Sequence, residues 1–321
     1  MAMELLGAAG MTNEMKQFYD KKLLDVAEKQ YVFMGFGDKR PIPVRGGKSI
    51  EFRRFERITV TAGSYTLTEG TPPTETNATV SNVQATISQY GMYSRITDVL
   101  NLQAYDPVIA EYTKAYGEAM AEALDVVVRN VLSGATTIQY ASTATVVGTS
   151  GAGAVGSGGY LNAAELLEAK RTLERAGARK VGAEYICLIH PDNEKDLFED
   201  PDIVDNFQYA GARGPGNPLF QGEMGNWMGI KFIKSNNLRI RTSYGMSGAD
   251  VYEIFMFGKG FYGVSELSAQ SARIYTQQPG GVTDPLEQYS TLGWKAALAA
   301  VILDNNFGVL INCASSRSNS A

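Results

Sequence analysis

The sequence predicts an α+β fold, in which strands and helices are mixed without strict alternation. One long segment, residues 107–132, has a helical pattern, whereas residues 49–61 interleave apolar and charged side chains as a strand does. After residue 229 several strand-like segments follow one another with no helix between them. A doubly wound α/β sheet would alternate strand and helix, so we favour α+β. Hydrophobic residues at 44% and charged residues at 20% are ordinary globular values and exclude wholesale disorder.

The chain begins with a polar arm at residues 1–38. Within it, apolar residues recur at spacings of three and four over residues 12–30, which predicts a helix.

Residues 39–97 predict a long two-stranded ribbon. The first strand covers residues 49–61, the return segment 83–97 alternates apolar and polar side chains, and a turn-rich, Thr-rich tip at 62–82 joins them. A two-stranded hairpin has no core of its own and is marginal in water. The ribbon therefore needs another surface, which either the same chain or a neighbouring copy supplies.

The clearest single element is the helix at residues 107–132. Asp106 is a plausible N-cap, Pro107 takes the first helical position and Gly134 follows the end. At about 1.5 Å per residue it forms a rod of about 39 Å, long enough to act as a spine. Asp125 and Arg129 have the spacing of a favourable surface pair. The expected apolar stripe comprises Val108, Tyr112, Ala115, Tyr116, Ala119, Ala123, Leu124, Val127 and Val131, opposite Glu111, Glu118, Glu122, Asp125 and Arg129.

The second half of the chain alternates short elements with loops. Asn162 and Glu165 form a capping-box pattern that opens a helix ending at Gly177. Other loops are a Gly/Ala/Ser tract at 148–159 and a Gly/Pro-rich segment at 211–225. We expect strands at 136–147, 185–189, 229–234, 251–257, 261–267, 272–277, 288–303 and 307–313, and a short acidic helix at 192–199.

Charge and cysteine usage exclude several classes of protein. A net charge of −5 and a pI near 5.2 argue against sequence-specific nucleic-acid binding. Cys187 and Cys313 lack metal-type spacing, so we interpret them as buried thiols of a protein made in a reducing cytoplasm. The N-terminus has no secretory pattern, and the longest apolar run, residues 296–303, is too short to span a membrane. We expect a soluble cytoplasmic product.

Residues suited to catalysis are few. His190, the only histidine, precedes Pro191 where a strand would pass into a helix, and we interpret it as a capping residue because no nucleophile or orienting carboxylate can be assigned to it. Gly151, Gly153 and Gly156 match a dinucleotide-binding pattern, but the next helix starts too late and the required acidic residue falls inside a helix. We therefore expect a flexible loop there, no cofactor and no metal site.

Four stretches resemble the major capsid proteins of tailed bacteriophages, specifically the coat-protein family typified by the podovirus N4. They are residues 68–73 (TEGTPP), 85–100 (ATISQYGMYSRITDVL), the long helix after Asp106, and 288–301 (QYSTLGWKAALAAV). The resemblance implies the Hong Kong-97-type coat fold. Its parts would be an N-terminal arm (1–38), an E-loop ribbon (39–97), a peripheral domain (98–147 with 268–321, spine helix 107–132) and an axial domain (148–267).

The same resemblance implies a structural protein that is not an enzyme and that forms pentamers and hexamers of an icosahedral head around double-stranded DNA. Its partners would be copies of itself, a scaffolding protein, a portal, possibly a decoration protein and, non-specifically, the packaged DNA, with no membrane. The E-loop would lie on the adjacent subunit, which would cover its apolar residues, and charge pairs would orient the contact. The expected contact residues are Glu51, Phe52, Arg53, Arg54, Phe55, Glu56, Arg57, Ile58 and Glu69.

Two alternatives stay open at this stage. An encapsulin-type nanocompartment shell would share the fold but enclose an enzyme. An NAD-binding oxidoreductase would rest only on the glycines at 151–156. A covalent cross-link through Lys48 is not supported, because no partner asparagine or catalytic glutamate can be assigned.

Overall fold

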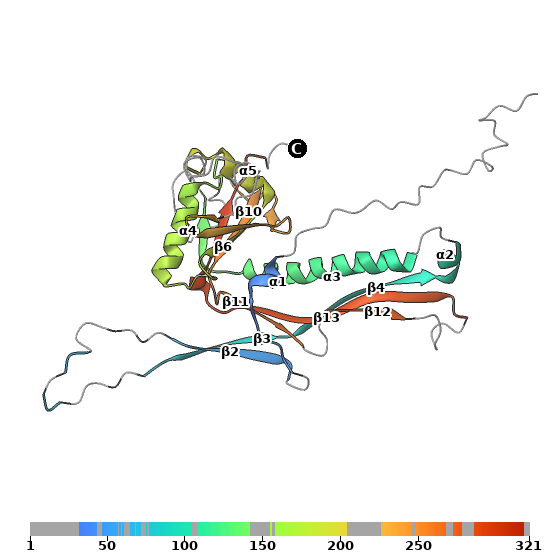
Figure 1. Ribbon diagram of the computed structural model, residues 1–321, viewed down its shortest axis with the longest axis horizontal. Helices are drawn as coiled ribbons and strands as arrows, with labels where there is room; N and C mark the ends of the chain where they lie inside the picture. The colour runs from blue at the N-terminus through green and yellow to red at the C-terminus, as the bar shows by residue number, and fades with distance from the viewer. Residues whose placement is uncertain are drawn as a thin grey trace, which may run out of the picture.

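A compact module stands at one end of a long flat arm, and a narrow ribbon extends from the base of the module (Figure 1). The helix at 12–30, the loop at 211–225 and most of the tract at 148–159, all expected from the sequence, lie outside the described residues. The computed structural model describes residues 32–43, 47–56, 58, 60, 65–67, 69–71, 75, 77–103, 108–141, 155, 158–203, 226–245, 248–267, 272–277 and 286–317.

The arm is built on a five-stranded sheet whose central strand is β13 (Tyr289–Ile302). On one side β13 pairs along ten residues with β4 (Ser88–Thr97). On its other side it pairs antiparallel with β11 (Tyr262–Glu266) and, further along, with β12 (Arg273–Gln277). The two-residue strand β1 (Asp38–Lys39) completes the sheet beside β11.

Helix α3 (Val108–Leu132) covers one face of this sheet. Its side chains Leu124, Val128 and Leu132 are buried against Trp294 and Leu298 of β13. The end of the arm carries the short helix α2 (Asp98–Gln103), which continues directly from β4. The expected spine helix is therefore present with nearly the expected bounds.

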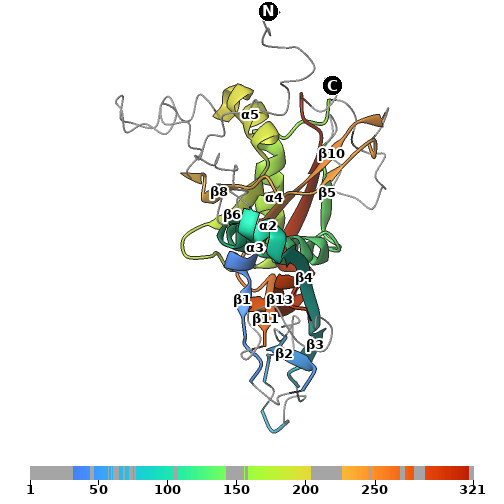
Figure 2. The ribbon, with the colours of Figure 1, turned by 90° about the vertical axis from the view of Figure 1, so that its right-hand side faces the viewer.

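The compact module contains a seven-stranded sheet in the order β5-β14-β10-β6-β8-β7, with β9 on β10. Helices α4 (Ala163–Ala176) and α5 (Pro191–Glu199) pack on one face, and the other face packs against α3 and the arm (Figure 2). Burial on both faces explains why β6 is a continuous apolar run and why β10 is apolar apart from Glu253, which forms an ion pair with Arg241. The strands are β5 (Ile138–Tyr140), β6 (Tyr185–Ile189), β7 (Asn226–Trp227), β8 (Ile230–Lys234), β9 (Ile240–Arg241), β10 (Val251–Phe257) and β14 (Gly308–Cys313).

The expected helix caps of the module are confirmed. The Asn162 side chain accepts a hydrogen bond from the Glu165 N–H, and Gly177 ends α4 with φ at 72°. A left-handed residue at this position favours glycine, which lacks the Cβ that would clash. His190 caps α5 by accepting from the Asp192 N–H, with Pro191 in the first turn.

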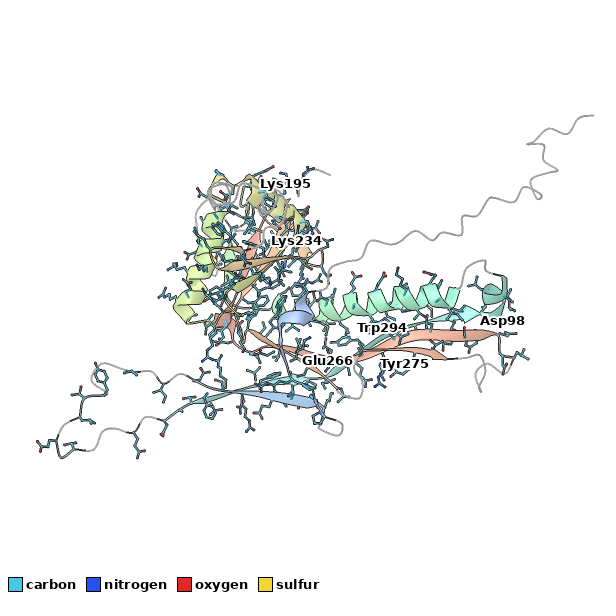
Figure 3. All side chains as sticks on the ribbon, in the orientation of Figure 1. Asp98, Lys195, Lys234, Glu266, Tyr275 and Trp294 are labelled. Carbon is cyan, nitrogen blue, oxygen red and sulfur yellow. The ribbon has the colours of Figure 1, made fainter. Side chains whose placement is uncertain are left out.

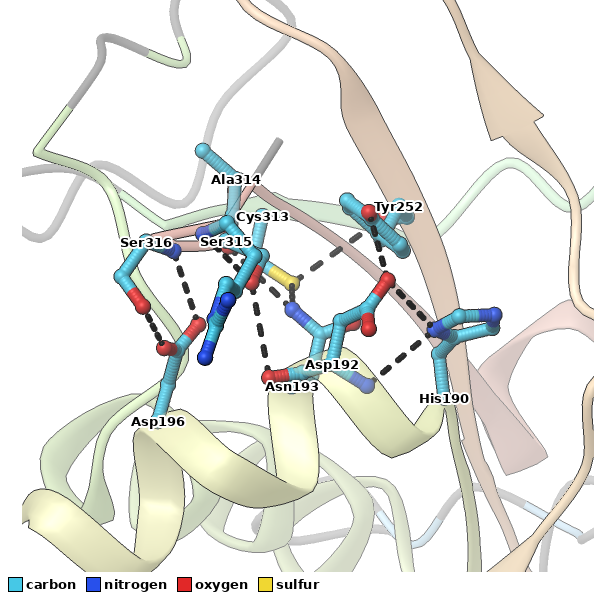
Figure 4. A network of polar contacts seen from close by, with 10 residues as sticks. His190, Asp192, Asn193, Asp196, Tyr252, Cys313, Ala314, Ser315 and Ser316 are labelled. Atoms are coloured by element: carbon cyan, nitrogen blue, oxygen red, sulfur yellow. Dashed lines mark hydrogen bonds and ion pairs between the residues drawn. The ribbon is translucent and has the colours of Figure 1, made fainter. Parts of the chain in front are cut away.

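Around α5, a polar network holds the end of β14 (Figure 4). Tyr252 donates to Asp192, Asn193 donates to the Ala314 carbonyl oxygen, and the backbone N–H of Ser316 donates to Asp196. Burial lowers the pKa of His190, although the adjacent Asp192 carboxylate opposes this shift. The single histidine thus has a structural role.

Both cysteines are fully buried and unpaired, Cys187 on β6 and Cys313 on β14. Burial raises the pKa of each thiol far above its usual range. Among the described residues, no helix combines the length and apolar character needed to cross a membrane.

Two expectations about chain organisation need correction. The paired strands of the ribbon are β2 (Ser49–Phe55) and β3 (Val80–Thr86), because after Ile87 the chain continues as β4 into the arm sheet.

The second correction concerns domain membership. Strands β5 and β14 belong to the module's sheet, although residues 98–147 and 268–321 were expected to form the peripheral part. Strand pairing between segments far apart in the sequence decides this membership, β5 with β14 and β14 with β10, and no local pattern reports it.

The predicted surface position of Asp125 is also wrong. Asp125 is fully buried under α1 (Phe33–Phe36), where its carboxylate accepts hydrogen bonds from the Met34 N–H at 3.2 Å and the Asn237 Nδ2 at 3.0 Å. Arg129 donates instead to the Asn237 carbonyl oxygen. Asp125 therefore joins the N-terminal segment, the spine helix and the module.

We predict that Asp125 makes the stability of the subunit depend on pH. Burial raises the pKa of Asp125 above its ordinary value of 3.8, so its favourable contribution is complete below that value and is lost as the pH rises through the raised folded-state pKa. Urea unfolding of the wild type and of Asp125→Asn, from about pH 4 to about pH 7, measures this. Wild-type stability should fall relative to the Asn variant as the pH rises. A constant difference across the range would contradict the prediction.

Candidate functional site

Of the residues expected to make subunit contacts, 51–55 lie on β2, Glu56 and Ile58 follow it, and Glu69 lies further on in the tip. The ribbon that carries them projects from the body of the molecule (Figure 3). Side chains alternate along β2, so that even-numbered residues face the arm sheet and odd-numbered residues face outward. The ribbon thus has one face turned to its own chain and one face open.

Phe52 occupies the inward face and is only 4% exposed. It packs with Ala85 of β3 and Ala299 of β13, and the Arg40 guanidinium lies 5.2 Å from its ring centroid. The absent side chain of Gly263 makes room for the ring, since a Cβ there would lie 2.8 Å from the Phe52 Cζ. The expectation that an adjacent subunit covers Phe52 is therefore wrong: its own sheet does.

Arg54 also faces inward and holds the ribbon to the turn after β13. It forms ion pairs with Asp304 and, at 2.8 Å, with Glu56, and its guanidinium lies 5.9 Å from the Phe307 ring centroid. Asp304 in turn caps the 3-10 helix η3 (Asn305–Phe307). Arg54 thus contacts its own chain from the ribbon.

Arg54 and Glu56 each stabilise the charged form of the other. A hydrogen bond from the Ser81 hydroxyl, followed by the one from Arg54, lowers the pKa of Glu56. The pKa of Arg54 is raised, first by its hydrogen bond to Glu56 and further by Asp304, against the opposing effect of burial. Both groups therefore stay ionised at neutral pH, and they fix the direction in which the ribbon leaves the body.

The outward face of β2 is exposed to solvent, in contrast to the inward face. Arg53 and Glu51 pair with each other at 3.1 Å in solvent, and Phe55 is 76% exposed. Beyond β2 the described residues of the tip expose further apolar side chains: Ile58, Val60, Tyr65 and Leu67. Glu69 is exposed as well, and Arg57 lies outside the described residues. None of the large apolar side chains that the structure describes on this face and in the tip is buried within the chain.

The structure offers little for catalysis or cofactor binding. In the part of the chain that it describes, no group of three or more His, Cys, Asp or Glu side chains could hold a metal ion. Of the residues spanned by the dinucleotide-like glycines, 151–156, only Val155 is described, and it is buried.

Comparison with known proteins gives the family. The sequence matches the family model described as "Phage capsid protein" over residues 81–309, well over half of the chain. This chain belongs to the phage capsid protein family. The match runs from the ribbon's second strand through the arm and the module to β14. Among curated proteins, no match is found.

Solved structures agree on the fold. The capsid protein of cyanophage Pam1 superposes with a TM-score of 0.76 at 15% identity, covering 98% of this chain and 100% of that chain. A chain of the capsid structure of cyanophage P-SCSP1u superposes with a TM-score of 0.70 at 18% identity, covering 97% of both chains. A chain of the capsid structure of Helicobacter pylori bacteriophage KHP30 superposes with a TM-score of 0.72 at 11% identity, covering 98% of this chain and 99% of that chain. At these identities, the likeness shows the fold.

The capsid family is a class of structural proteins and not of enzymes, so this chain is a building block of a phage shell. The comparisons support this function and give no support to a nanocompartment shell or to an oxidoreductase.

We predict that filling the space beside Phe52 will detach the ribbon from its own sheet. Gly263→Ala should displace the ring, and Phe52→Ala should cost about 3 kcal/mol by removing it from the cluster. Urea unfolding and protease cleavage within residues 56–79 measure the two effects. The double variant Gly263→Ala with Phe52→Leu should recover part of the loss, and an additive penalty would contradict the steric argument.

We also predict a measurable coupling between Arg54 and Asp304. Truncating either to Ala should destabilise the subunit, and a double-mutant cycle should give a coupling of about 1 kcal/mol, because the Asp304 side chain is only 9% exposed. Arg53→Ala is the matched control, since its solvent-exposed pair with Glu51 should matter by less than about 0.5 kcal/mol. Equal effects of the two arginines would refute the assignment.

Proposed function

We propose that this capsid protein is the major coat protein of a tailed phage and has the Hong Kong-97-type fold of the N4-like coat proteins. It assembles into pentamers and hexamers that build an icosahedral head around double-stranded DNA. The observation that carries the proposal is the ribbon, which projects beyond its own body with Phe55, Ile58, Val60, Tyr65 and Leu67 exposed. Apolar side chains in such a position become buried only when another molecule covers them.

Three features support the details of this proposal. The arm with α3, the module with α4 and α5, and the ribbon correspond in outline to a peripheral domain, an axial domain and an E-loop. The contact residues then divide by face: Phe52 and Arg54 set the ribbon's direction, whereas Glu51, Arg53 and Phe55 meet the neighbour. Each contact can be weak, because every subunit makes several at once.

The charge of the chain suits the enclosed genome. A net charge of −5 provides no field that would bind DNA tightly, so packaged DNA stays free to slide along the wall. Further partners in this proposal are a scaffolding protein and a portal. The protein is made in the host cytoplasm and resides in the virion.

Electron microscopy with negative stain and light scattering, on the chain expressed alone and with its neighbouring genes, tests the proposal. Closed shells, or rings of five and six subunits, are the expected result. A uniform species of one to four subunits under both conditions would overturn it.

We predict that Phe55 and Phe52 will separate assembly from folding. Phe55→Ser should change the free energy of unfolding by less than about 0.5 kcal/mol, because Phe55 is 76% exposed, yet it should lower the yield of shells. Phe52→Ser should lower stability directly, because it places a polar group in the apolar cluster. Unfolding curves and particle yield measure the two properties. Normal particles from Phe55→Ser would remove the outward face from the contact.

A further inference from the structure

His190 is the only histidine of the chain, and its ring nitrogen Nδ1 has two neighbours that need opposite protonation states. Nδ1 accepts a hydrogen bond from the Asp192 N–H at 3.2 Å, which caps α5, and it lies at the same distance from the Asp192 Oδ2 atom (Figure 4). The first contact requires a lone pair on Nδ1, whereas a carboxylate oxygen would accept from a proton there. The protonation of one atom therefore decides whether α5 is capped.

The geometry is that of the neutral ring. The proton of the imidazole sits on Nε2, since Nδ1 is the acceptor. The Tyr252 hydroxyl donates to the Asp192 carboxylate at 2.9 Å, and the Tyr252 ring lies against the imidazole with the two centroids 5.2 Å apart. The His190 side chain is thus held between the start of α5 and strand β10, with 14% of its surface exposed.

Protonation exchanges the cap for an ion pair. A proton on Nδ1 can be donated to the Asp192 carboxylate, but the first turn of α5 then loses the acceptor of its Asp192 N–H. The ion pair compensates only in part, because the Asp192 side chain is 39% exposed and solvent screens its charge. Burial of the ring lowers the pKa of His190 from the ordinary value of 6.5, although the Asp192 carboxylate opposes this shift. The capped state is therefore favoured at neutral pH.

The groups that surround the ring leave this balance to His190. Burial, followed by the hydrogen bond to Asp192, raises the pKa of Tyr252 far above neutrality. Burial likewise keeps the thiol of Cys313 neutral where it faces Tyr252 from β14. Lys234, on β8 beside the end of β6, is paired with Glu194 at 3.0 Å. His190 is thus the group around the cap that responds to mild acid.

Helix α5 holds the end of the chain through its side chains. The Asn193 side chain donates to the Ala314 carbonyl oxygen at 3.2 Å, and the Asp196 carboxylate accepts from the Ser316 N–H at 3.1 Å (Figure 4). Both contacts come from the first two turns of α5, which are the turns that the cap at His190 orders. Loss of the cap therefore weakens the attachment of residues 314–317.

We propose that His190 is a pH-sensitive switch whose protonation uncaps α5 and frees residues 314–317 from the module. The inference goes beyond the proposed function, because it concerns the folded subunit whether or not it assembles. A histidine whose pKa is lower in the folded state stabilises that state above the unfolded-state value of 6.5, and this contribution is lost as the pH falls through the folded-state pKa.

Hydrogen exchange followed by mass spectrometry tests the switch on the full chain. His190→Asn is the matched variant, since an Asn side chain also caps helices but does not ionise. At about pH 7 both proteins should exchange alike over residues 190–200 and 310–317. At about pH 5 these segments should exchange about fivefold faster in the wild type than in the variant, the factor expected for a lost cap. Peptides from β13 should not differ. An equal response of both proteins to pH would overturn the proposal.

A titration of the ring gives a second, independent measurement. Because the chain has one histidine, its ring protons give a single NMR titration curve. The midpoint should lie below 6.5, and Asp192→Asn should lower it further by removing the carboxylate that favours the charged ring. His190→Ser supplies another cap that does not ionise and should behave in hydrogen exchange as His190→Asn does. A wild-type midpoint at or above 6.5 would contradict the switch.

Discussion

The architecture depends on one strand. β13 runs for fourteen residues and pairs with β4 along one edge and with β11 and β12 along the other. One of its faces is covered by α3, and its other face receives Phe52 from the ribbon. The strand β13 therefore positions both the spine helix α3 and the ribbon relative to the arm sheet. A shift of one residue in its register would turn the side chains that contact α3 and those that contact the ribbon to the opposite faces.

Sequence reasoning succeeded where a pattern is local. The spine helix, the cap at Asn162, the capping role of His190 and the strands from residue 185 onward follow from side-chain periodicity and from residues with strong positional preferences. The resemblance to phage capsid proteins was confirmed at the level of the family. Its finer consequences, including the domain names and the neighbour's contact with the ribbon, stay predictions.

Long-range features explain what was missed. Asp125 has the spacing of a surface ion pair, and only the distant Met34 and Asn237 make it a buried acceptor. Phe52 resembles its neighbour Phe55 in sequence, yet the missing side chain of Gly263, more than two hundred residues away, admits one ring to the interior and leaves the other in solvent. The hollow between Tyr93 of β4 and Tyr275 of β12, with Gly293 of β13 at its floor, could not be predicted, because its walls come from three strands that meet only in the folded sheet.

The deep burial of Cys187 and Cys313 has a consequence for the life cycle of a particle. A thiol whose ionisation is suppressed is a poor nucleophile and exchanges slowly with disulfides. The folded subunit therefore presents no reactive thiol to its surroundings. A change from reducing to oxidising surroundings leaves both thiols of the folded subunit as they are, so disulfide bonds take no part in the cohesion of the shell.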